Sequence, residues 1–124
     1  MPEPSDDAVA SLLDRAAALD LMRPIMGWFT EEEAELLLDT AARALSEASG
    51  TVEDRAVVEI GSYFGRSTVL LASAVRDLRP SGRLTAIDPH DGVISLAGRA
   101  NLQGSPTLEA FCRNLAAAGL RDVV

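Results

Sequence analysis

The stretch Ala56-Val57-Val58-Glu59-Ile60-Gly61-Ser62-Tyr63-Phe64-Gly65-Arg66-Ser67-Thr68 decides the fold of this chain. Residues 56–60 are mostly apolar and β-branched, which predicts a buried parallel strand. Gly61 then opens a turn, and the helical pattern that follows predicts a helix over about 66–78. A glycine turn before a helix offers free N–H groups and the positive end of the helix dipole to a small polar ligand. The alternative is a turn that needs glycine for steric reasons alone.

A second strand and an acidic residue follow this unit. Residues 80–82, Pro-Ser-Gly, form a turn that ends the helix, and residues 83–87 predict another buried strand. Asp88 comes directly after that strand. In nucleotide-binding βαβ units, an acidic side chain at this position accepts hydrogen bonds from ribose hydroxyls. The alternative is an aspartate that only begins a turn before Pro89.

The string Glu59-x-Gly61-x-Tyr63-x-Gly65-x-Ser67 resembles motif I of class I S-adenosylmethionine (SAM) dependent methyltransferases. It is most similar to the small-molecule O-methyltransferases of the catechol and macrocin type. The G-x-G-x-x-G fingerprint of dehydrogenases is absent, because the glycine after Gly61 is four residues on. The resemblance implies SAM as the cofactor and methyl transfer to the hydroxyl of a small-molecule acceptor. An NAD-type nucleotide-binding enzyme is an alternative that the spacing disfavours.

The resemblance also assigns roles within this motif. It implies that Gly61 and Gly65 allow close approach of the cofactor. It implies further that Ser67 binds the amino-acid carboxylate of SAM and that Tyr63 packs against the cofactor. Glu59 would tie the turn to the ammonium end of SAM.

Asp88-Pro89-His90 completes the implied cofactor site. By resemblance Asp88 holds the ribose and His90 borders the adenosine, whereas an ordinary turn histidine is the alternative. Ser62 and Arg66 depart from the family pattern, which has alanine and tyrosine there in many members. The full set of expected cofactor-binding residues is Glu59, Gly61, Ser62, Tyr63, Gly65, Ser67, Asp88, Pro89 and His90.

Two helices are predicted before the central strand. Ser5 is the expected N-cap of a first helix of about fourteen residues. Thr30 and Glu33 have the spacing of a capping box, which predicts a second helix that runs to about Ala48. The connector between them is unusually apolar, and in the resembling family such segments cover the SAM cleft. We therefore expect a lid or substrate wall, with packing between helices and sheet as the alternative. Its residues are Met22, Met26, Trp28 and Phe29.

The C-terminal part predicts a flap, a helix and a strand. Residues 93–104 are rich in glycine and long for a simple connection, so we expect a flap over the cleft. Ser105 and Pro106 predict a helix start, and Gly119 predicts its end. Its expected apolar face consists of Leu108, Phe111, Cys112 and Leu115, with Cys112 as a buried structural thiol. Residues 122–124 predict a third strand.

These elements predict an α/β fold, a Rossmann-like βαβαβ parallel sheet in the order 3-2-1, preceded by two helices. We expect a helical cap over residues 1–50 and a SAM-binding half-domain over 51–124 that is truncated after its third strand. The resemblance implies half of a seven-stranded methyltransferase fold. In that family the other half carries the catalytic residues and the ligands of a divalent metal such as Mg²⁺. The sequence therefore identifies neither a catalytic residue nor a metal ligand.

Composition narrows the classes of partner and location. The 124 residues suit one small globular unit, and the net charge of −8 disfavours nucleic acids and anionic membranes. The acidic N-terminus does not resemble a signal peptide, so we expect a cytoplasmic protein. The unpaired edge of the first strand leaves a further alternative open, a non-catalytic subunit that binds SAM or only a partner. A second chain or self-association would then cover that edge.

Overall fold

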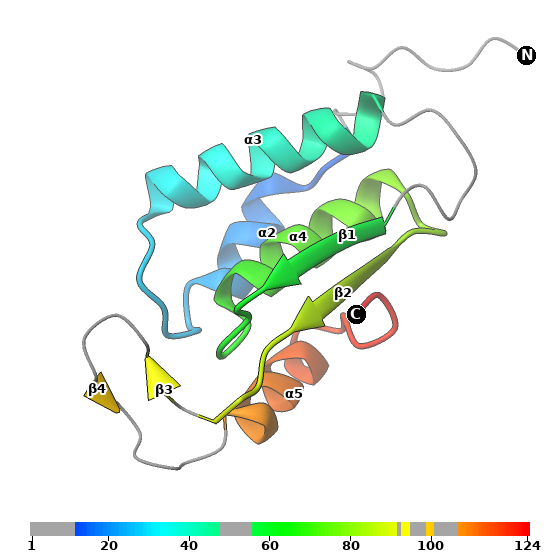
Figure 1. Cartoon of the computed structure of the whole chain (residues 1–124). Coiled ribbons are helices and arrows are strands. Elements are labelled where there is room, and N and C mark those ends of the chain that lie inside the picture. The colour runs from blue at the N-terminus through cyan, green and yellow to red at the C-terminus, as the bar shows by residue number, and fades with distance from the viewer. Residues whose placement is uncertain (1–11, 48–55, 92, 95–98, 101–106) are drawn as a thin grey trace, which may run out of the picture.

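A parallel two-stranded sheet, with helices packed on one face, forms the centre of the molecule (Figure 1). The structure, a computed structural model, describes residues 12–47, 56–91, 93–94, 99–100 and 107–124. Strand β1 (Ala56–Ile60) pairs with strand β2 (Arg83–Ile87) in a register that sets Ala56 opposite Arg83 and Ile60 opposite Ile87. Helix α4 (Arg66–Leu78) connects the two strands. The predicted strand, helix and strand are thus confirmed with their boundaries.

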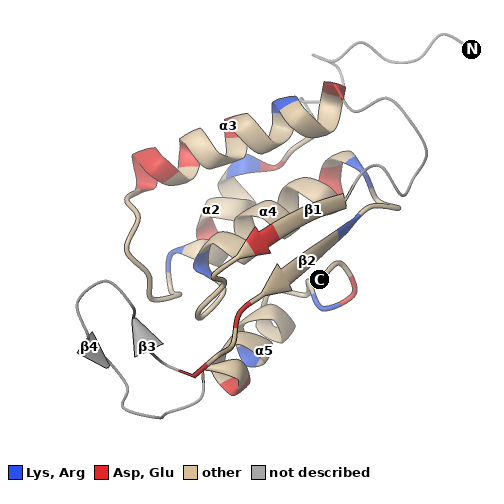
Figure 2. Cartoon of the chain, viewed as in Figure 1, with Lys and Arg blue, Asp and Glu red and all other residues tan. Residues whose placement is uncertain are grey.

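Two helices precede the sheet and pack on α4. Helix α2 (Arg15–Met22) begins after Asp14, whose carboxylate accepts a hydrogen bond from the Ala17 amide at 3.0 Å. Ser5, the expected N-cap, lies outside the described residues. Helix α3 (Glu31–Glu47) begins with a cluster of acidic side chains, which suit the positive end of its dipole (Figure 2).

The capping box of α3 has both of its hydrogen bonds. The Thr30 amide donates to Glu33 Oε2 at 2.7 Å, and the Glu33 amide donates to Thr30 Oγ1 at 3.2 Å. The two side chains therefore satisfy two N–H groups that the helix itself leaves free. Within the described residues, no helix is long and apolar enough to cross a membrane.

Replacement of this cap is expected to weaken the whole fold slightly. Thr30→Ala removes the hydroxyl acceptor of the Glu33 amide, so we expect the free energy of unfolding to fall by about 1 kcal/mol. Thermal unfolding followed by circular dichroism measures this change. Thr30→Ser is the matched control because it keeps the hydroxyl, and equal melting temperatures for the Ala and Ser variants would contradict the role of the cap.

The third strand expected over residues 122–124 is not formed. Residues 121–123 lie in a turn, and the Val123 amide donates to Leu120 O at 3.1 Å, so it does not enter a strand ladder. One contact still joins this segment to the sheet, because the Leu84 amide donates to Val123 O at 2.9 Å. The carbonyl of Ile87 accepts a hydrogen bond from the Gly61 amide, so the backbone groups of Ile87 face β1. Backbone groups of successive strand residues face opposite edges, and Leu84 is three residues from Ile87, so the Leu84 amide faces the edge away from β1. The C-terminal turn thus lies beside β2, and the order 3-2-1 stays a prediction.

The segment after β2 differs in part from the predicted one. Strands β3 (Val93–Ile94) and β4 (Arg99–Ala100) pair antiparallel within the expected flap. Helix α5 (Leu108–Ala117) has Thr107 as its N-cap, while Ser105 and Pro106 lie outside the described residues. Gly119 has φ +69° directly after the helix, as expected of a stop.

The apolar face of α5 is narrower than predicted. Phe111 and Leu115 are buried in the core, but Leu108 is exposed because it lies in the first turn, outside the packed face. Cys112 is half-buried against the core rather than fully enclosed.

The core lies on one side of the sheet. Helices α2 to α5 all contribute buried side chains to a single cluster. On β1, however, Val58 and Ile60 are exposed, Ile60 by 83%, and Ile87 on β2 is exposed as well. The expectation of a fully buried strand is therefore wrong in the part of the chain that the structure describes, because helices cover only one of its faces.

Candidate functional site

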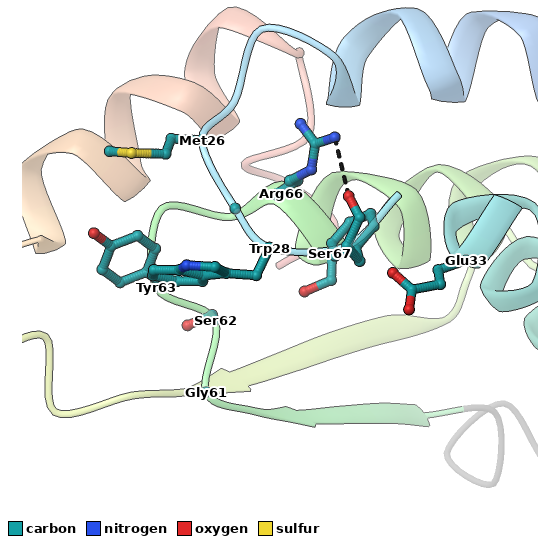
Figure 3. A pocket seen from close by; sticks show the side chains of 10 residues that line it. Met26, Trp28, Glu33, Gly61, Ser62, Tyr63, Arg66 and Ser67 are labelled. Carbon is teal, nitrogen blue, oxygen red and sulfur yellow. Dashed lines mark hydrogen bonds between the residues drawn. The ribbon is translucent and has the colours of Figure 1, made fainter. Parts of the chain in front are cut away.

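A pocket of about 340 Å³ lies at the carboxyl end of β1, between the α2–α3 connector and the turn that leads into α4 (Figure 3). This is the end of a parallel sheet at which α/β proteins bind their ligands, and the volume suits a small molecule. The lining residues are Met26, Gly27, Trp28, Phe29, Glu33, Gly61, Ser62, Tyr63, Arg66 and Ser67.

The turn from Gly61 to Gly65 forms the floor of the pocket. Gly61 and Gly65 have φ values of +85° and +92°, and Tyr63 between them has φ +50°. The Gly61 amide donates to Ile87 O at 2.9 Å, which fixes the turn to β2. A Cβ atom built on Gly61 would meet no atom within 4 Å, so the backbone is open to a ligand at this position.

Gly65 packs against α5, and the close approach of a cofactor that the resemblance implies there stays a prediction. A Cβ atom at Gly65 would lie 3.2 Å from Cδ2 of Phe111, a buried side chain of α5. Gly65 also does not line the pocket. The absence of a side chain at Gly65 therefore lets α5 pack against the turn, whereas only Gly61 faces open space.

Glu59 supports the turn from below the pocket. The residue is only 8% exposed, and its carboxylate accepts hydrogen bonds from Ser67 Oγ at 2.6 Å and from Thr68 Oγ1. Both hydroxyls belong to the first turn of α4, where a negative charge is favourable. Glu59 thus ties β1 to the start of α4. Thr68 is not among the residues predicted from the sequence, although its hydroxyl directly follows that of Ser67 in the chain.

Asp88 connects the turn to the loop after β2. Its Oδ2 accepts from the Tyr63 amide at 2.8 Å, and its Oδ1 accepts from the His90 amide at 2.7 Å. The carboxylate therefore holds two backbone segments together. Each oxygen retains acceptor capacity for a further donor, because a carboxylate has about four lone-pair sites.

His90 lies on the α5 side of this loop. It has φ +53°, its Nδ1 is 2.7 Å from Thr107 Oγ1, and its ring lies 5.0 Å from that of Phe111. Neither Pro89 nor His90 lines the pocket. These contacts fit the alternative of a structural turn histidine.

The expected wall divides into a core residue and three pocket residues. Met26, Trp28 and Phe29 line the pocket, and the Trp28 ring lies 4.9 Å from that of Tyr63 (Figure 3). Met22 is fully buried in the core, as the packing alternative describes, because it ends α2 facing α4. Only the three residues after α2 are placed to act as a wall.

Three lining residues were not predicted as site residues. Gly27 and Glu33 come from the connector and the first turn of α3, and Arg66 is the first residue of α4. Glu33 was identified only as a helix cap. Arg66 was noted only as a departure from the family pattern, although an arginine at a helix N-terminus is itself an unusual signal.

Two hydroxyl groups of the turn are left without a partner. Ser62 is 3% exposed, and its Oγ has no hydrogen-bond partner among the described residues. The same holds for the hydroxyl of Tyr63, whose pKa is raised by burial. A buried polar group without a partner is costly, so both hydroxyls are candidates to bind a polar ligand.

The described residues contain no cluster of three or more His, Cys, Asp or Glu side chains that could hold a metal ion. Glu33 is the one carboxylate among the residues that line the pocket, and its Oε2 accepts the Thr30 amide of the capping box. The arrangement suits binding and orientation of a ligand.

One comparison with known proteins bears on this site. The model of a family described as "Methyltransferase domain" matches residues 58–124, which is more than half of the chain. The match begins inside β1 and includes the turn, α4, β2 and α5.

Proposed function

Because this chain belongs to the methyltransferase-domain family, we propose that it binds SAM in the pocket above the 61–65 turn and serves methyl transfer to a small-molecule hydroxyl. The observation that carries this proposal is the open backbone at Gly61 beside the unpartnered, buried Ser62 hydroxyl. These features fit a ligand that carries polar groups and lies close to the backbone of the turn.

The residues of the pocket would divide the work of holding the cofactor. When bound, SAM supplies a sulfonium methyl group for transfer. Gly61 would allow close contact with the backbone, and Ser67 at the start of α4 would bind the amino-acid carboxylate through its backbone N–H, because its hydroxyl donates to Glu59. Asp88 does not itself line the pocket but bonds the amide of Tyr63, which does, and it would accept from the ribose hydroxyls through its remaining lone pairs.

The connector would complete the site on the acceptor side. Met26, Trp28 and Phe29 offer an apolar wall opposite the turn. Such a wall would orient the acceptor and exclude water near the transferred methyl group. The chain would therefore contribute orientation, and the catalytic base stays unassigned.

A non-catalytic SAM-binding subunit is the second candidate. The exposed Val58, Ile60 and Ile87 favour it, because apolar side chains on one sheet face are typical of a surface that packs against something else. Methyl transfer by the chain in a radiolabelled SAM assay with a panel of phenols and sugars would exclude this candidate.

Calorimetric titration tests the cofactor directly. We expect the chain to bind SAM and to show no heat of binding with NAD at the same concentrations, since the turn lacks the dinucleotide fingerprint. Trp28 is the only tryptophan of the chain, and its fluorescence provides a second signal from the pocket wall. Binding of NAD in place of SAM, or of neither ligand, would overturn the proposed function.

A further inference from the structure

We infer that Arg66 is a positioning residue that fixes the connector, and with it the pocket wall, to the turn. The inference deepens the proposed function. Only its prediction for SAM affinity rests on the proposed function, whereas its predictions for the protein without ligand do not. The hydrogen bonds of Arg66 to connector carbonyls carry the inference, and one of them is drawn in Figure 3.

The Arg66 guanidinium gathers carbonyl groups from the end of α2 and along the connector. Its Nη1 donates to Ile25 O at 2.6 Å and also lies 3.3 Å from Met22 O and 3.4 Å from Arg23 O. Its Nη2 donates to Phe29 O at 3.3 Å. One side chain thus holds both ends of the segment that carries Trp28.

The electrostatics of two helices explain why an arginine occupies this place. As the first residue of α4, Arg66 puts a positive charge at a helix N-terminus, which is unfavourable for that helix. The same guanidinium reaches Met22 O and Arg23 O at the C-terminal end of α2, where a positive charge is favourable. The charge of Arg66 therefore favours the contact between α2 and α4, although it does not favour α4 alone.

The connector is also shaped around the stem of this side chain. A Cβ atom on Gly27 would overlap Cδ of Arg66 and would lie 3.1 Å from its Cβ. On the other side, the guanidinium carbon lies 4.9 Å from the centre of the Phe29 ring, a cation–π distance. Gly27 and Phe29 therefore enclose Arg66, which leaves the connector little freedom to shift without losing these contacts.

The position of Arg66 in the chain links this contact to the ligand site. It directly follows Gly65, the last residue of the turn that forms the floor, so the residue that holds the wall is joined to that turn. Movement of the connector would change the distance between wall and floor. Arg66 thereby sets the width of the pocket.

Trp28 fluorescence tests this inference without any ligand. We expect Arg66→Met to lower the fluorescence anisotropy of Trp28 at temperatures where far-ultraviolet circular dichroism shows a folded protein. Arg66→Lys, which keeps the charge but cannot reach carbonyls at both ends, should lie between Met and wild type. Arg76→Met is the matched control on the same helix, since Arg76 bonds only its neighbour Asp77 among the interactions described. Wild-type anisotropy in a folded Arg66→Met variant would overturn the inference.

Where Arg66→Met unfolds, the comparison of Arg66→Lys with Arg76→Met keeps the inference testable, and a double-mutant cycle tests the packing of Gly27 on Arg66 separately. Gly27→Ala should destabilise the wild-type chain, and the effect should largely disappear in an Arg66→Ala background, because the overlapping Cδ atom is gone. Additive effects of the two substitutions would overturn the packing argument.

SAM titration separates this inference from the proposed function. We expect Arg66→Met to weaken SAM binding about 10-fold, a loss typical of one or two polar contacts. The control Arg76→Met should bind SAM as the wild type does. Equal SAM affinity of wild type and Arg66→Met would overturn the link between wall and ligand. Failure of the wild type itself to bind SAM would instead refute the proposed function and leave the anisotropy and cycle results valid.

Discussion

Gly65→Ala is expected to lower the free energy of unfolding by about 4 kcal/mol, a large part of the stability of a small domain. Two costs add at this position. An alanine at φ +92° is strained, and its Cβ would press on Phe111, 3.2 Å away. Phe111 is buried and packs on the His90 ring, so it has little room to move.

Gly61→Ala is the matched comparison, because it has nearly the same φ, +85°, but no neighbour within 4 Å of the new Cβ. It should cost only the backbone strain, about 1–2 kcal/mol. Urea denaturation of the two variants measures the difference. For SAM affinity the order of the two variants should reverse: Gly61→Ala should weaken SAM binding more than Gly65→Ala does, since its new methyl group would enter the open floor of the pocket. Equal destabilisation by both substitutions would contradict the assignment of Gly65 to packing.

The central part of the fold was predictable because its signals are local. A short β-branched run, a glycine turn and a helical period fix β1, α4 and β2 without reference to the rest of the chain. The segment at 122–124 was not predictable in the same way. Its composition suits a strand, but the Val123 amide donates to Leu120 O in a turn. Whether this segment forms a strand or a turn depends on tertiary contacts, which the local sequence does not show.

The site was predictable where a residue type has one evident use. The sequence singles out the carboxylates of Glu59 and Asp88, and their roles toward a cofactor stay predictions; their partners, hydroxyls of α4 and backbone amides, are evident only in the three-dimensional arrangement. The two glycines look equivalent in the sequence, and only the position of Phe111 distinguishes them. Arg66 was missed because its acceptors are carbonyls more than thirty-five residues away in the chain.

Asp88→Ala is expected to be nearly as damaging as Gly65→Ala, and it should affect ligand binding more. The substitution removes the acceptor of the Tyr63 and His90 amides, so two partly buried N–H groups lose a charged partner. We expect a loss of about 3 kcal/mol in the free energy of unfolding. SAM affinity should fall by at least about 10-fold, because the turn loses its support and the ribose loses its acceptor.

Asp88→Asn separates these two contributions. Asparagine has the same shape and keeps one carbonyl oxygen as an acceptor. Its NH₂ group, however, would face a backbone N–H and cannot accept a hydrogen bond from it. We therefore expect about half the destabilisation of Asp88→Ala, measured by urea denaturation, together with weaker SAM binding measured by calorimetry. If Asp88→Asn had wild-type stability and bound SAM normally, neither the support of the turn nor the ribose contact would depend on the carboxylate. If it lost stability but bound SAM as the wild type does, Asp88 would serve the turn alone, and the ribose would have to be held by another group.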